Sequence, residues 1–218
     1  MPWYAWPAGL VLVGLAWFAL ARPLTVAPRL GVAPVFELID QQGRTVTHQA
    51  FAGRPVLYSF FPASTEDATA VTMARQLQAL QRRLSQDADR QERLRLVTVS
   101  VRPEHDDPAR LAAFARRLDA DPSIWQFLTG PGLAVKLMVG TGFGVYYDAR
   151  AQAPAGVVYD PRYVLVDGQG LIRGIYSGPR LDAERLLRDL DLVLQEARAE
   201  GAARFAYEAA HLFLCYPR

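Results

Sequence analysis

The sequence predicts an α/β domain with a central mixed β-sheet, preceded by a single N-terminal transmembrane helix. Three observations predict the domain. An apolar run over residues 55–61 gives way, after a turn, to residues 66–85, where apolar side chains recur at helical spacing. A second apolar run, 94–101, completes a strand–helix–strand unit whose two strands should be parallel. Hairpins at 35–47 and 163–177 should add antiparallel strands, which makes the sheet mixed.

The composition excludes several classes of protein. A chain of 218 residues can form one domain of ordinary size, with a core that needs no disulfide. Its 24 basic and 22 acidic residues give a net charge of +2, which is too balanced for a nucleic-acid-binding surface or a polybasic membrane patch. The single cysteine, Cys215, excludes an intrachain disulfide and every metal site that uses two thiolates.

Residues 1–22 are predicted to form a membrane anchor. No charged side chain occurs before Arg22, and a helix of this length can cross a bilayer at about 1.5 Å per residue. Trp3, Tyr4 and Trp6 lie at one end, as in the aromatic belt of a membrane helix. The alternative is a cleaved signal peptide, but no basic residue precedes the apolar run.

The residues after this anchor bear on its orientation. Arg22 and Arg29 follow the span, so the positive-inside rule alone favours a cytoplasmic C-terminal domain. Residues 23–34 contain three prolines and should form an extended tether between the anchor and the domain.

The domain itself is predicted to span residues 35–198. Residues 35–40 alternate between apolar and polar side chains, and a turn brings the chain back through 45–47, which predicts a β-hairpin. The central strand and its helix follow. The polar run 86–93 then leads into the second parallel strand.

The second half of the domain begins with a helix over 108–119, because Asp107 and Pro108 provide the favoured order of N-cap and first helical residue. Further elements should follow in this order: a short strand at 125–130, a short helix at 132–138, a Gly- and aromatic-rich loop or strand at 140–147, the hairpin at 163–177, and a helix at 182–198. Residues 199–218 are predicted to be a tail that packs on this domain or on another subunit.

Five separated blocks, in order over residues 36–195, carry a family signature. They are Phe36 to Gly43, Val56 to Phe61, Val99 to Pro108, Trp125 to Gly130, and Tyr163 to Gly168. Together they resemble the Sco/SenC family of thioredoxin-like proteins, usually anchored by one N-terminal helix with the domain outside the cytoplasmic membrane. Such proteins deliver copper to, or reduce the cysteines of, the binuclear copper site of cytochrome c oxidase. The resemblance implies a periplasmic domain on a bacterial inner membrane. This is the opposite of the orientation that Arg22 and Arg29 alone favour.

The family's working residues are a C-x-x-x-C motif after the central strand and a histidine shortly before the late hairpin. Copper favours soft thiolates and imidazole, which explains these residue types. Matched onto this sequence, the cysteine positions fall at Ala63 and Asp67, and the histidine position falls at Tyr159 or Asp160. All three ligands are absent at the matched positions. We therefore expect the fold of a copper-binding family in a chain that has no catalytic, cofactor or metal site.

Other polar residues are candidates for a replacement site. We interpret Glu66 and Asp67 as acidic residues that complement the dipole of the following helix rather than as metal ligands. The loop 105–107, with one histidine and two aspartates, is interpreted as solvated, since we find no further ligands for a metal. His211 and Cys215 have i, i+4 spacing on a possible helix, but two ligands do not make a metal site.

No catalytic arrangement stands out in the sequence. It has no defensible Ser-His-Asp pattern and no G-x-x-x-x-G-K phosphate loop, and residues 140–144 lack the strand-to-helix context of a dinucleotide site. Ala63 and Ser64 cannot provide the thiol that a thioredoxin-type enzyme needs at the helix start. Tyr146 and Tyr147 are interpreted as packing around the matched ligand positions.

The resulting hypothesis is a non-enzymatic, membrane-anchored protein that acts by contact. It would serve in the assembly of cytochrome c oxidase or its copper site, or as an accessory subunit of a membrane complex such as a respiratory one. Its partners would be that complex or its assembly factors. The alternative is a copper-delivering metallochaperone with a rebuilt site that uses Asp67, Tyr159, Asp160 or a histidine; copper is a cofactor only in this alternative.

Overall fold

The computed structural model describes residues 26–63, 66–86, 94–149 and 156–213. The predicted membrane anchor lies outside these residues. Within the described part of the chain, no helix is both long and apolar enough to cross a membrane. The described part of the chain divides into two compact units: one within Leu30–Leu187, and a second that contains residues 26–29 and 188–213.

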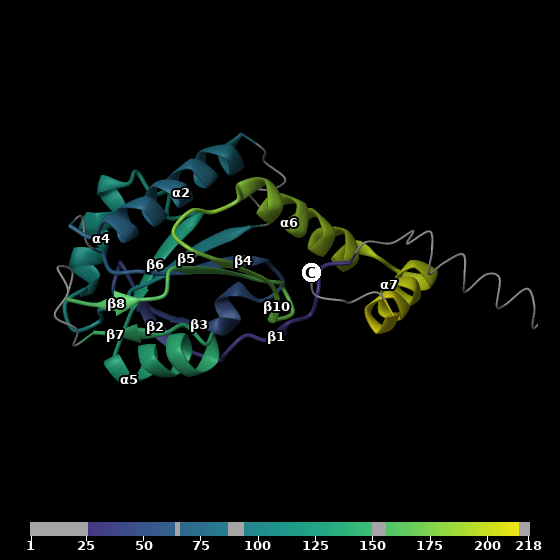
Figure 1. Cartoon of the computed structure of the whole chain (residues 1–218), viewed down its shortest axis with the longest axis horizontal. Helices are drawn as coiled ribbons and strands as arrows, with labels where there is room; N and C mark the ends of the chain where they lie inside the picture. Colours follow the sequence, from purple (N-terminus) through teal and green to yellow (C-terminus); the bar gives the residue numbers. More distant parts are fainter. Residues whose placement is uncertain (1–25, 64–65, 87–93, 150–155, 214–218) are drawn as a thin grey trace, which may run out of the picture. The chain divides into compact units, whose positions relative to one another are not determined.

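The described part of the larger unit contains an eight-stranded sheet with the strand order β1-β10-β9-β4-β5-β6-β2-β3 (Figure 1). β4 pairs in parallel with β5, and β5 with β6, whereas the other pairs are antiparallel. The predicted mixed sheet is therefore confirmed. Its strands are β1 (Gly31–Val32), β2 (Glu37–Asp40), β3 (Thr45–Thr47), β4 (Val56–Phe60), β5 (Arg95–Val99), β6 (Trp125–Thr129), β9 (Arg162–Val166) and β10 (Leu171–Ser177).

Helices lie on both faces of this sheet. Figure 1 shows α2 (Ala68–Ser85) and α4 (Pro108–Arg117) on one side of the strands and α5 (Gly132–Val135) on the other. The π-helix η2 (Lys136–Gly142) continues directly from α5, and the short 3-10 helix η1 (His48–Phe51) lies between β3 and β4. The arrangement is a three-layer α/β/α domain.

The two long helices of this unit begin at aspartate caps. The Asp67 carboxylate accepts a hydrogen bond of 2.9 Å from the backbone N–H of Thr69, and the Asp107 carboxylate accepts one of 2.7 Å from Arg110. Such caps satisfy backbone donors that the first helical turn leaves unpaired. Pro108 follows its cap at the first helical position, as the sequence predicts.

Strand alternation places large apolar side chains on both faces. Tyr58, Phe60, Val97 and Val99 belong to the core cluster on the α5 side, together with Phe143. On the α4 side, Trp125 stacks on Phe127 with ring centroids 4.8 Å apart, and Phe114 and Phe127 pack edge to face with ring centroids 6.1 Å apart. The Trp125 indole N–H donates to the Thr98 hydroxyl at 2.9 Å, so this buried donor is satisfied.

Several segments differ from the sequence-based expectation. Part of the predicted tether, Gly31–Val32, pairs with β10 as an edge strand. Residues 140–142, expected in a loop or strand, belong to the π-helix η2, and the tail contains a helix, α7 (Gly201–Phe213), after α6 (Ala183–Arg198). A second, two-stranded sheet pairs β7 (Tyr147–Asp148) with β8 (Val158–Tyr159).

Candidate functional site

The matched ligand positions lie on two connections at one end of the domain. Ala63 and Asp67 stand in the segment between the end of β4 and the start of α2. Tyr159 ends β8, and Asp160 follows it just before β9, which is paired with β4. The first backbone N–H groups of the helix that follows the central strand point toward this junction and have no partner within the helix. The junction therefore favours polar and negatively charged groups.

The structure joins two of these positions directly. The Tyr159 hydroxyl donates a hydrogen bond of 2.8 Å to one carboxylate oxygen of Asp67. The other carboxylate oxygen of Asp67 accepts the N–H of Thr69, so both oxygens are engaged. Asp67 therefore acts as a helix cap and also fastens β8 to the start of α2.

The surroundings of Tyr159 keep its phenol protonated. Burial of the ring raises its pKa most, and the hydrogen bond to Asp67 and the negative charge of Asp67 raise the pKa further. A neutral phenol is the form that can donate to a carboxylate. The pair is thus arranged as a protonated donor and a charged acceptor, and such hydrogen bonds are stronger than neutral ones.

Asp160 takes a different role from its neighbour. Its carboxylate forms an ion pair with Arg162, and its backbone N–H donates to the Tyr146 carbonyl at 2.9 Å. Arg162 also donates to the Gly144 carbonyl at 3.1 Å. Of the two residues that match the family's histidine position, Tyr159 is therefore the one that contacts Asp67.

Asp106 fixes the segment that carries Ala63. One Asp106 oxygen accepts the Ala63 backbone N–H at 2.8 Å and the Ser100 hydroxyl at 2.6 Å. The other oxygen lies 3.3 Å from Nε of Arg110, and only 1 % of the Asp106 residue is exposed. The expectation of a solvated loop is wrong for this residue, because two buried donors converge on its carboxylate. The sequence marks Asp107 as a helix cap through the following Pro108, but it carries no signal for the burial of Asp106.

The other candidate ligands are dispersed. Glu66 and His105 are exposed. His211 contacts Glu196 at 2.9 Å within the smaller unit, and Cys215 lies outside the described residues. In the described ranges, no three His, Cys, Asp or Glu side chains are grouped as a metal site requires.

A surface hollow of about 900 Å³ borders this end of the domain. Its lining comes from α5, η2 and the strand β7, and it includes Leu133 and Tyr146, whose exposed fractions are 70 % and 64 %. Exposed apolar side chains that gather at one hollow, rather than lying scattered, are candidates for contact with another protein. Tyr147 also lines the hollow but is half-buried against the core cluster, so it combines both roles.

A comparison with models of protein families shows to which family the chain belongs. Residues 27–195 match the family model described as SCO1/SenC. The chain belongs to the SCO1/SenC family. This confirms the resemblance that the sequence blocks carry, and with it the thioredoxin-like α/β fold. No curated protein sequence matches the chain.

Solved structures share the fold of this SCO1/SenC protein. A SCO1/SenC family lipoprotein from Bacillus anthracis matches with a TM-score of 0.69 and 20 % identity over 78 % of this chain and 99 % of that one. BsSco, from a study of a disulfide switch in the Sco family of cytochrome c oxidase assembly proteins, matches with a TM-score of 0.67 and 21 % identity over 81 % of this chain and 99 % of that one. Copper-bound ScoI from Arabidopsis thaliana matches with a TM-score of 0.64 and 18 % identity over 76 % of this chain and 99 % of that one.

Proposed function

We propose that this protein works without enzymatic activity, by contact with other proteins, in the assembly of cytochrome c oxidase or its copper site, or as an accessory subunit of a respiratory membrane complex. Family membership supports the link to oxidase assembly, since the related BsSco is described as a member of a family of such proteins. The hydrogen bond between Asp67 and Tyr159 supports action by contact, because it occupies two of the positions matched to copper ligands.

The chemistry of this pair does not fit copper. Copper(I) prefers thiolate and imidazole, whereas carboxylate is a hard ligand and a protonated phenol is a poor one. A metal at Asp67 would have to break the bond from Tyr159, and the raised pKa of Tyr159 opposes its conversion to a phenolate ligand. Ala63, the third matched position, has no donor in its side chain. A copper-delivering site rebuilt on these residues is therefore disfavoured.

We also propose that the protein is anchored in a bacterial inner membrane by residues 1–22, with its domain on the periplasmic side. The apolar segment supports the anchor, and the name of the Bacillus anthracis relative, a lipoprotein, fits a family that works at membranes. The exposed Leu133 and Tyr146 beside the matched positions offer an apolar surface for the partner.

Co-purification tests this proposal. The tagged full chain, extracted from membranes in a mild detergent, should bring down oxidase subunits or oxidase assembly factors, identified by mass spectrometry. Leu133→Asp should reduce the recovery, because a charge replaces an exposed apolar contact, whereas Arg116→Asp on the outer side of α4 should not. Recovery without any oxidase component, from cells that contain the enzyme, would contradict the proposal.

A further inference from the structure

The last helix, α7 (yellow in Figure 1), has an apolar outer face. Apolar residues occur in the sequence at positions 202, 205, 209 and 212, a spacing that places these positions on one face of a helix. Phe205, on this face, is 78 % exposed, whereas Ala210, on the other side of the helix, is buried. One side of α7 is therefore covered, and the other presents a large aromatic side chain.

Charged side chains tie α7 to the segment that follows the predicted membrane anchor. Arg29 donates to the two carboxylate oxygens of Glu208 at 3.0 and 2.9 Å, and to Glu196 of α6 at 2.9 Å. Glu196 also contacts His211 at 2.9 Å. An exposed ion pair contributes most when it is a paired fork within such a network. Residues 26–29 and α7 belong to the same compact unit, as this tie requires.

The tie limits how far α7 can lie from the anchor. Residues 23–29, seven in all, lead from the end of the predicted anchor to Arg29. A fully extended chain of that length reaches about 25 Å. If residues 1–22 span a membrane, the backbone of Arg29 lies within this distance of the end of the span, and Arg29 holds α7 beside it. A bilayer is thus the apolar phase that the chain itself brings close to Phe205.

We propose that α7 lies on the membrane surface, with its outer face, including Phe205, among the lipid acyl chains. This inference rests on the membrane anchor proposed above. It goes beyond the anchor because it gives the other end of the chain a second, peripheral contact with the same bilayer. The ion pairs of Arg29 hold the two contacts within one compact unit.

The apolar face, rather than charge, should drive this contact. Residues 201–213 contain one arginine, one glutamate and one histidine, so α7 lacks the basic residues that attract anionic lipids. A short apolar face binds a bilayer weakly by itself. The anchor makes the contact intramolecular, which raises the effective concentration of lipid at α7. We therefore expect the same contact with zwitterionic and with anionic lipids.

A fluorescent probe on α7 of the full chain tests the proposal. Cys215→Ser removes the single native cysteine, and Ala209→Cys supplies an attachment point on the outer face while Phe205 stays in place. The labelled chain is reconstituted into phosphatidylcholine vesicles, with or without phosphatidylglycerol. In both, brominated lipids should quench the probe, and iodide in the water should quench it far less than a probe attached through Thr45→Cys.

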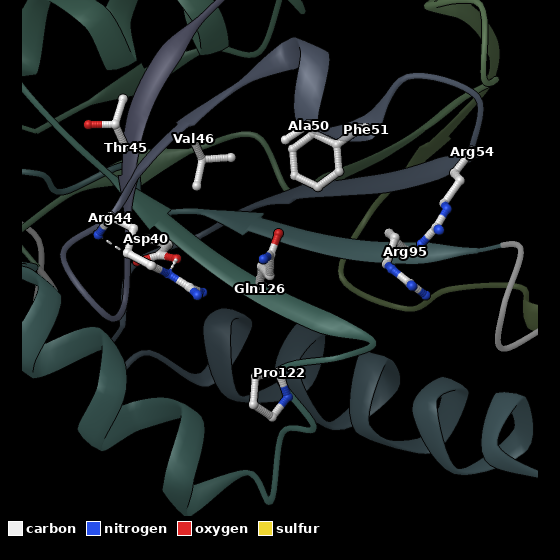
Figure 2. Close-up of a pocket in the computed structure, with 10 residues that line it drawn as sticks. All are labelled: Asp40, Arg44, Thr45, Val46, Ala50, Phe51, Arg54, Arg95, Pro122 and Gln126. Carbon is white, nitrogen blue, oxygen red and sulfur yellow. Dashed lines mark hydrogen bonds and ion pairs between the residues drawn. The ribbon is translucent and has the colours of Figure 1, made fainter.

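Thr45 on β3 is the control position. Figure 2 shows it beside Arg44, whose ion pair with Asp40, at 2.8 Å, lies at one end of a hollow of about 290 Å³ in the larger unit. Thr45 is exposed, and these neighbours are charged. A probe at this position should therefore stay in water, open to iodide and out of reach of brominated lipids.

Variants show which side chains make the contact. Phe205→Asp should abolish most of the lipid quenching at position 209, because a carboxylate is costly to bury among acyl chains. Leu137→Asp places the same charge on another exposed apolar residue, outside α7, and should leave the quenching unchanged. Arg29→Gln should reduce the quenching, since it removes the tie between α7 and the anchor.

Flotation of the vesicles separates this inference from the anchor on which it rests. A chain that floats with the vesicles, but whose probe on α7 is open to iodide and not quenched by lipid, would overturn the contact of α7 and leave the anchor intact. A probe shielded from both quenchers would mean that protein covers α7, which would also overturn the proposal. A chain that does not float would overturn the anchor and this inference with it.

Discussion

The hydroxyl of Tyr159 donates a hydrogen bond of 2.8 Å to the carboxylate of Asp67, which lies 92 residues earlier in the chain. In the match to the Sco/SenC pattern, Asp67 stands at a cysteine position and Tyr159 at the histidine position. Two residues that would together hold a soft metal ion are thus replaced by two that bind each other. This hydrogen bond links β8 to the start of α2.

This bond should contribute measurably to stability. Tyr159→Phe removes the donor and leaves a half-buried carboxylate oxygen of Asp67 without its partner, so we expect the free energy of unfolding to fall by about 1–2 kcal/mol. Asp67→Ala should cost more, because it also removes the N-cap of α2, worth about 1 kcal/mol. Urea denaturation, with the midpoint and slope compared between variants, measures both changes.

Tyr146→Phe is the matched control for this experiment. Tyr146 is 64 % exposed, and its loss of a hydroxyl should leave the unfolding free energy unchanged. The double variant of Tyr159→Phe and Asp67→Ala should lose less unfolding free energy than the two single variants lose in total, because both substitutions remove the same contact. Strict additivity would show that the two side chains do not interact.

The same pair predicts a dependence on alkaline pH. Burial, and then the bond and charge of Asp67, raise the pKa of Tyr159 above its ordinary value. A raised pKa in the folded state gives a stabilisation that is complete below the ordinary tyrosine pKa of about 10 and is lost progressively above it. The stability difference between the wild type and Tyr159→Phe should therefore be constant from neutral pH to about pH 10 and shrink at higher pH.

Denaturation curves collected at a series of pH values test this sign. Tyr58 and Tyr147, whose pKa values burial also raises, are present in both proteins, so their contributions cancel in the difference. A difference that stays constant well above pH 10 would mean that Tyr159 ionises in the folded protein as readily as in the unfolded chain, and one that grows with pH would mean that it ionises more readily in the folded protein. Either result would contradict the raised pKa.

Neighbouring aspartates should have different effects on stability. Asp106→Ala leaves the buried Ala63 N–H and Ser100 hydroxyl without an acceptor, and we expect a loss of about 3 kcal/mol. Asp107→Ala removes a helix cap at an exposed position and should cost about 1 kcal/mol. Equal losses, measured by urea denaturation, would show that Asp106 is no more important to the fold than a surface cap.

Local pattern was sufficient to predict much of the fold. The apolar runs at β4 and β5, the helical spacing of α2 and the Asp107–Pro108 start of α4 all depend on neighbouring residues, and each is confirmed. The π-helix η2 was not predicted, because its glycines resemble those of a loop. Gly142 is explained by packing, since a Cβ there would collide with the ring of Pro34.

Contacts between distant segments could not be predicted in the same way. Nothing in the sequence around Tyr159 indicates that its hydroxyl would reach Asp67, since the contact exists only when β8 lies over the start of α2. The order Asp107–Pro108 predicts the cap, but nothing in the polar loop predicts that Asp106 is buried while Asp107 is exposed. The family pattern alone identified Asp67 and Tyr159 as matched positions, and the structure adds that they touch.

Copper titration tests the central claim most directly. Copper(I) is added to the reduced protein in the presence of a competing chelator, with two triple variants as controls. Ala63→Cys, Asp67→Cys and Tyr159→His together should create stoichiometric binding, because they supply two thiolates and an imidazole on the same frame. The same cysteines with Asp160→His should bind more weakly, since Asp160 pairs with Arg162 instead of facing Asp67.

The wild type should bind no stoichiometric copper in the sub-micromolar range, because its carboxylate and protonated phenol are engaged with each other. Tight, stoichiometric copper on the wild type, reduced by Asp67→Asn or Tyr159→Phe, would contradict the account and restore copper delivery as the protein's function.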